Sequence, residues 1–185
     1  GDFAFEAQWS LGPADNFPRL TLRFQPQRTG YYSLAFVGFG EYPVDQVDFL
    51  LLPFLWHSRR LPAESLMLVE SFTPTPISLG QVTTGQTTVS YGVVADPGEI
   101  RLRWPRPVNS RFGLTIRGPA GGVLPVLFAP IMGSQESLMQ AGTEYAFTLQ
   151  VLVQPGDWFG AYRKVVEEEF GFHDYRSNWS FSLND

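Results

Sequence analysis

The chain is dominated by short runs in which apolar and polar residues alternate, the period-two pattern of a half-buried β-strand. The first two runs cover residues 3–9 and 20–25, where every second side chain is apolar. Residues 31–39 and 47–56 are apolar on both faces, which predicts a strand in the centre of a sheet for 31–39. Pro53 interrupts the second of these runs and predicts a bulge or an edge strand there.

The same pattern continues through most of the chain. Further strands are predicted over residues 66–71, 77–82, 87–94, 100–104, 112–117, 123–128 and 145–153. The segments between them have turn chemistry, such as DPG, PRP and GPAGG. Strands that recur about every 10 to 14 residues indicate an antiparallel sandwich or barrel. We therefore predict an all-β chain, a large antiparallel β-sandwich, with no linker that would divide it.

The period changes once, near the C-terminus, to that of an α-helix. Asp157 is a suitable N-cap because its carboxylate can accept hydrogen bonds from free N–H groups. One apolar stripe follows at helical spacing, and it consists of Phe159, Tyr162, Val166 and Phe170. Gly171 is placed to end the helix. The acidic run 167–169 lies in the last turn, where the helix dipole disfavours negative charge, and Arg163 is one neighbour that can offset it.

Composition narrows the classes of function. The 185 residues carry a net charge of −5 with no basic run, so nucleic acid is not an expected partner. There is no cysteine and there are only two histidines, which excludes disulfides, thiol catalysis, cysteine-ligated zinc and a histidine-rich metal site. No cofactor is predicted. The longest apolar run, 49–56, is too short to cross a membrane as a helix. A periplasmic or extracellular bacterial protein fits this composition.

Catalytic constellations are weak. His57 precedes Ser58, but no nucleophile-elbow motif is present. Carboxylates that could cleave glycosides occur as Asp45 with Asp48, as Asp96 with Glu99, and in the run 167–169. Each also has a structural explanation: a solvated strand start, a turn and a solvated helix face. We predict that this chain is not an enzyme.

Exposed aromatic residues are a stronger possibility, because sugar-binding sandwiches stack pyranose rings on them. The best group is Trp56 with His57 and Arg59 at a strand end, and Trp104, between two arginines, is second. Core or interface packing is the alternative for every tryptophan here. An oligosaccharide or polysaccharide ligand therefore stays a hypothesis at this point.

Read together, the second half of the chain resembles a known family. The similar segments are VSYGVVADPGEIRLRW, NSRFGLTIRGPAGGVLPVLFAPIMGSQESLMQAG, GDWFGAYRKVVEEEFGFHDYRSN and the terminal SLND. They resemble the N-terminal, supersandwich-like β-sandwich module of bacterial six-hairpin glycosidases. In those proteins a linker helix joins the sandwich to an (α/α)6 barrel. The resemblance covers residues 31–185 and rests on an overall pattern, with no catalytic motif in it.

The resemblance implies a non-catalytic accessory domain of a glycoside hydrolase, packed against a downstream catalytic domain of the same polypeptide. Residues 1–156 would be the sandwich, and 157–185 the linker helix and a joint to that domain. The joint residues would be Trp158, Tyr162, His173, Asp174, Tyr175 and Arg176. The family has a basic residue where this chain has His173, which leaves any salt bridge there in doubt. The alternatives are an independent carbohydrate-binding module, and a surface or adhesion protein.

Overall fold

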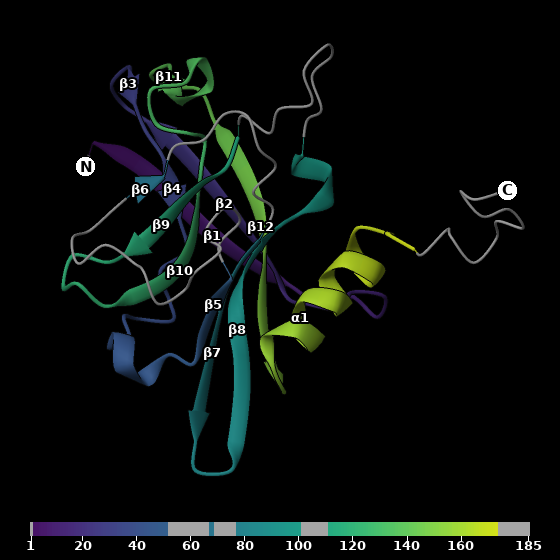
Figure 1. Cartoon of the computed structure of the whole chain (residues 1–185). Coiled ribbons are helices and arrows are strands. Elements are labelled where there is room, and N and C mark those ends of the chain that lie inside the picture. The colour runs from purple at the N-terminus through teal and green to yellow at the C-terminus, as the bar shows by residue number, and fades with distance from the viewer. Residues whose placement is uncertain (1, 52–66, 69–76, 101–110, 174–185) are drawn as a thin grey trace, which may run out of the picture.

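The computed structural model of the chain describes residues 2–51, 67–68, 77–100 and 111–173 (Figure 1). The predicted fold class is confirmed, because antiparallel β-strands dominate and one short helix lies near the C-terminus. The largest sheet contains, in order, β1 (Phe3–Ser10), β2 (Arg19–Pro26), β12 (Tyr145–Pro155), β8 (Thr87–Ala95), β7 (Ile77–Thr84) and β5 (Phe49–Leu51). Every pairing in this six-stranded sheet is antiparallel.

Shorter strands form the second layer. One sheet contains, in order, β4 (Leu34–Ala35), β10 (Val123–Ala129), β9 (Gly113–Arg117) and β6 (Met67–Leu68). A two-stranded sheet pairs β11 (Leu138–Met139) with β3 (Gly30–Tyr31). The described loops contain the 3₁₀ turns η1 (Val44–Gln46), η3 (Pro97–Glu99) and η4 (Gln135–Ser137).

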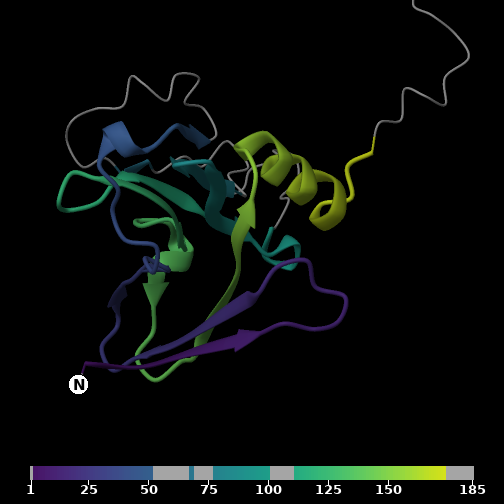
Figure 2. The same cartoon turned by 90° about the horizontal axis from the view of Figure 1, so that it is seen from below.

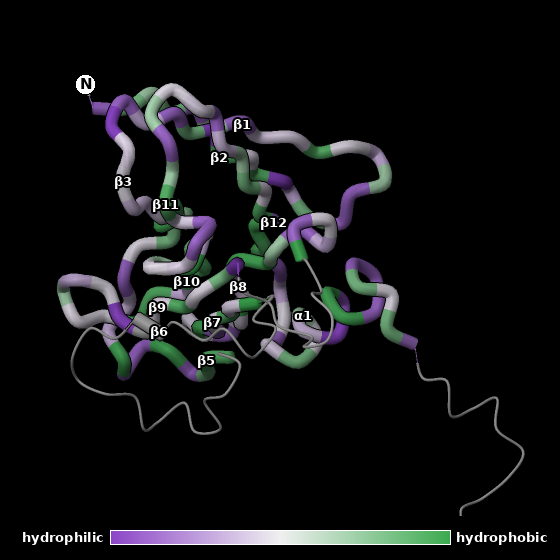
Figure 3. The backbone as a smooth tube through the Cα atoms, turned by 90° about the horizontal axis from the view of Figure 1, so that it is seen from above, coloured by the Kyte–Doolittle hydropathy of each residue, from purple (hydrophilic) through white to green (hydrophobic). Residues whose placement is uncertain are grey.

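The main core lies between the two layers. Hydrophobic positions gather along β8, β10 and β12 (Figure 3). One buried cluster joins Leu22 of β2, Val93 of β8 and Leu149 of β12 to Leu114 of β9 and Leu127 of β10. Burying these side chains removes apolar surface from water, which is the main force that holds the sheets together.

A second core lies on the other face of the six-stranded sheet, under the helix. Here Val94 of β8 and Leu152 of β12 pack with Ala161 and Val165 of the helical segment. Neighbouring residues on β8 and β12 point to opposite faces. The two cores together therefore explain why the sequence of these strands is apolar on both faces, since each strand lies between the second layer and the helix.

Two sequence predictions about individual strands are wrong. Residues 31–39 do not form a central strand, because within them only Tyr31, in β3, and Leu34–Ala35, in β4, are in strands. Their apolar side chains still reach the core: Leu34 packs against it from β4, and Tyr32, Phe36 and Phe39 pack against it from the loops on either side. The strand over 3–9 forms, but it is exposed on both faces instead of half-buried.

The two ends of the six-stranded sheet lie far apart. Figure 2 shows β1 along one margin of the molecule and the terminal helix towards the opposite one. Among the described strands, β5 is the last one on the helix side, which agrees with the edge-strand alternative of the prediction for 47–56. Among the described residues, no helix has the length and apolar character needed to cross a membrane.

Candidate docking groove on the terminal helix

The helical segment begins at the β5 edge of the large sheet. It consists of α1 (Trp158–Lys164) followed by a π-helical turn, η5 (Val165–Glu169). Asp157 is the N-cap, as predicted, and its carboxylate accepts from the Gly160 N–H at 2.8 Å. The Trp158 N–H donates to Oε1 of Gln81 on β7 at 3.0 Å. The Trp158 indole stacks on Phe49 of β5 with ring centroids 4.1 Å apart. These contacts fix the start of the helix.

The end of the segment is fixed by Glu169. Its carboxylate accepts from the side-chain amides of Gln150 at 2.8 Å and Asn16 at 2.9 Å. Gln150 is buried on β12, so this bond also gives its side-chain NH2 group an acceptor in place of water. Two hydrogen bonds to a carboxylate can offset the unfavourable position of this charge at a helix C-terminus. The sequence suggested only Arg163 for that task.

Gly171 ends the segment with φ of 66°, a conformation that favours glycine. This confirms the predicted role of Gly171. The next N–H, that of Phe172, donates to the Val166 carbonyl at 3.0 Å. The chain therefore turns back along the helix, and the Phe172 side chain lies beside its outer flank.

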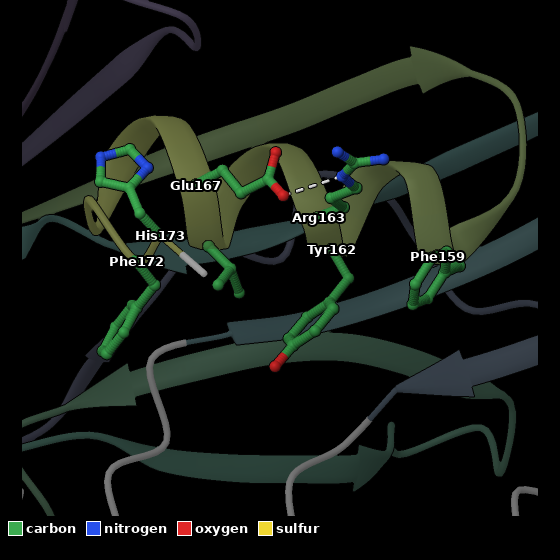
Figure 4. A pocket seen from close by; sticks show the side chains of 7 residues that line it. Phe159, Tyr162, Arg163, Glu167, Phe172 and His173 are labelled. Atoms are coloured by element: carbon green, nitrogen blue, oxygen red, sulfur yellow. Dashed lines mark hydrogen bonds and ion pairs between the residues drawn. The ribbon is translucent and has the colours of Figure 1, made fainter. Parts of the chain in front are cut away.

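This return creates a groove of about 450 Å³ on the flank of the helix. Its lining consists of Phe159, Tyr162, Arg163, Val166, Glu167, Phe172 and His173. Figure 4 shows the rings of Phe159, Tyr162 and Phe172 projecting to the same side of the helix. Phe159 is 57% exposed and Phe172 is 63% exposed, so both rings present most of their surface to solvent.

Small residues explain why the groove points outwards. The helix rests on the sheet through Ala161 and Val165, which are both fully buried. An alanine lets the helix axis approach the strands closely. Of the predicted stripe of larger side chains, Tyr162 and Phe170 are partly buried against this core, whereas Phe159 is turned to the flank and exposed.

Polar groups form one rim of the groove. Arg163 Nε donates to Glu167 Oε1 at 2.8 Å, one helical turn away. This hydrogen bond and the charge of Glu167 raise the pKa of Arg163 above its ordinary value. The pair is exposed, so it contributes little to stability. It can instead select the charge pattern of a partner that covers the rings.

The lining of the groove contains one carboxylate, Glu167, which is paired with Arg163. Elsewhere in the described residues, two of the candidate acids make structural contacts. Asp96 accepts from the Gly98 N–H at 2.9 Å, and Glu99 accepts from the Thr148 N–H at 2.9 Å and pairs with Arg111. Within the described ranges, no group of three or more acidic or histidine side chains could hold a metal ion.

Some of the residues predicted for sites are described by the structure and the others are not. Tyr162 and His173 line the groove, whereas Trp158 packs inwards on Phe49. The remaining predictions lie outside the described residues, and these are Trp56, His57, Arg59, Trp104, Asp174, Tyr175 and Arg176.

Sequence reasoning did not assign Phe159, Val166 or Phe172 to a site. The first two belong to the apolar stripe, which already predicted one continuous face of the helix. The signal for Phe172 was its place immediately after Gly171, because a residue there folds back onto the last turns of a helix.

Comparisons of this chain with protein-family models, with curated proteins and with solved structures return no match.

Proposed function

We propose that this chain is a non-catalytic accessory β-sandwich domain of a bacterial carbohydrate-active enzyme, located in the periplasm or outside the cell. It packs against a catalytic domain of the same polypeptide through the groove on its terminal helix. The observation that carries the proposal is the exposure of Phe159 and Phe172 on the flank of a helix whose opposite side is fixed to the sheet.

The composition of the groove supports a protein partner. Protein interfaces are enriched in aromatic side chains and arginine, with polar groups at the rim. The groove has this arrangement, with three rings in line and the Arg163–Glu167 pair beside them. Rings such as Phe159 and Phe172 bury large apolar areas when a partner covers them.

The resemblance to the sandwich module of six-hairpin glycosidases adds the kind of partner. In that family the linker helix leads from the sandwich to the barrel, and the similar segment GDWFGAYRKVVEEEFGFHDYRSN includes the whole groove. The carboxylates of this chain that could have cleaved glycosides and whose contacts are described, such as Glu99 and Glu169, support loops and the helix. The hydrolytic groups would belong to the partner domain.

The test compares this chain alone with the complete polypeptide encoded by its gene, by hydrogen exchange. Amides of residues 158–173 are expected to exchange at least tenfold more slowly in the complete polypeptide. The double variant Phe159→Ser, Phe172→Ser should remove that difference. The matched control is Val37→Ser, an exposed apolar residue of the other layer, which should leave it intact. A gene without a catalytic domain, or equal exchange in the two proteins, would refute the proposal.

One observation favours a second candidate, a surface or adhesion protein. That function requires an edge strand that can accept another strand, and β1 is such a strand. Binding of a foreign extended peptide at β1, seen as chemical-shift changes confined to β1 and β2, would support it. If no surface peptide of the same organism changes the chemical shifts of β1 and β2, that result would argue against the adhesion function. The carbohydrate-binding alternative depends on Trp56 and Trp104, outside the described residues.

A further inference from the structure

The most unusual surface of the described chain is the free edge of the six-stranded sheet. β1 is first in the strand order, so within the described residues no strand pairs with its outer side. It is eight residues long, and its register with β2 has no bulge. The sequence FAFEAQWS contains no proline and no lysine. Natural edge strands usually carry such devices to prevent pairing with another chain.

The side chains of β1 are also apolar on one face. Phe5 lies opposite Phe24 and Trp9 lies opposite Leu20, and directly opposed residues share a face of the sheet. Phe24 and Leu20 are buried in the main core, but Phe5 is 52% exposed and Trp9 is 51% exposed. Phe36 packs edge-on against Trp9, with ring centroids 5.5 Å apart, but about half of the surface of Phe5 and of Trp9 stays open to solvent.

The direction of the backbone groups follows from one hydrogen bond. The Gln27 N–H donates to the Asp2 carbonyl at 2.9 Å, so the backbone groups of Asp2 point towards β2. This direction alternates along a strand. Phe5, Ala7 and Trp9 therefore direct their N–H and C=O groups away from the sheet, where another strand can bind them.

We propose that the occupant of this edge is a second copy of the chain, which pairs antiparallel through its own β1 about a twofold axis at Ala7. Such an interface uses the same surface on both molecules. Outward-directed residues must oppose one another for the hydrogen bonds to form. Ala7 then faces the partner's Ala7, and the two sheets join into one.

Charge selects this register over its neighbour. With the axis at Ala7, Phe5 opposes the partner's Trp9, and Glu6 opposes the partner's Gln8, whose amide can donate to the carboxylate. With the axis at Glu6, an equally long overlap would place Glu6 directly opposite the partner's Glu6. Like charges in that position are destabilising, whereas aromatic pairs are stabilising. Axes at other residues shorten the overlap.

Cross-linking can test the register directly, because the chain contains no cysteine. In the proposed dimer the two Ala7 Cα atoms would lie about 5.5 Å apart. That distance is suitable for a disulfide. Ala7→Cys should form a covalent dimer under mild oxidation in at least fivefold higher yield than the control Glu6→Cys. The two Glu6 positions would be diagonal neighbours, too far apart to be bridged.

Sedimentation of the unmodified chain gives the second measurement. A monomer–dimer equilibrium is expected, and Phe5→Asp should weaken it at least tenfold because an aromatic pair is lost on each side of the axis. A chain that stays monomeric at about 100 µM overturns the proposal. Preferential cross-linking of Glu6→Cys, or equal yields from both variants, also overturns it.

Discussion

The two edges of the six-stranded sheet are treated in opposite ways. At one edge, β5 has only three residues, Pro53 follows shortly after it, and Phe49 is covered by the Trp158 ring. At the other edge, β1 has eight residues, all of them exposed, and among the described residues no strand pairs with its outer side. A short edge under a helix is protected from pairing with other chains, whereas a long bare edge is available for it. The chain thus closes its sheet on one side only.

The largest effect should come from removing the cover of the β5 edge. Trp158→Ala deletes the ring that stacks on Phe49 and should lower the free energy of unfolding by about 3 kcal/mol. Trp9→Ala removes the same type of side chain from the bare edge, where half of the ring is already in water. It should cost less than about 1 kcal/mol. Urea unfolding of both variants measures the difference, and equal losses would show that the edges do not differ as described.

A smaller effect should follow from releasing the far end of the helix. Glu169→Ala leaves the buried Gln150 amide without its acceptor and should cost about 2 kcal/mol. The neighbouring exposed Glu168→Ala is the matched control and should leave unfolding unchanged. Proteolysis at the helix can distinguish local from global opening. If Glu169→Ala is as stable as its control, the helix does not depend on this anchor.

The smallest effect is expected at the bare edge itself. Ala7→Lys places a long charged side chain on a strand that is exposed on both faces. The free energy of unfolding of the monomer should change by no more than about 0.5 kcal/mol. The measurement is thermal unfolding at a low protein concentration. A loss similar to that of Trp158→Ala would mean that β1 is covered and that the contrast between the two edges is false.

The sequence predicted the fold class well because period-two patterns depend only on which face of a strand meets the core. The long strands β2, β7, β8 and β12 were all located. It could not show that Phe5 and Trp9 stay exposed, because an alternating strand at an edge has the same pattern as a covered one. Nor could it show that residues 31–39 pack mostly from loops, since apolar side chains fill a core whatever the backbone conformation.

The helix shows a similar limit. Its N-cap, its terminal glycine and its apolar stripe were predicted from local chemistry, which does not depend on tertiary packing. The stripe included Tyr162 and Phe170, which pack against the core under the helix, but it did not include Ala161, which gives a weak hydrophobic signal although it determines how closely the helix approaches. The groove also depends on the backward turn at Phe172, which joins residues that the helical period alone would not group.

The π-helical turn has a consequence for the angular position of everything after it. In η5 the Phe170 N–H reaches the Val165 carbonyl at 3.1 Å, five residues back, so this turn holds one residue more than an α-helical turn. In an α-helix each residue advances by about 100° around the axis. If the same residues formed a regular α-helix instead, the positions of Glu169 and Phe172 would be rotated by up to about that angle. The carboxylate would leave Gln150 and the ring would leave the groove, so one extra residue sets the phase of both.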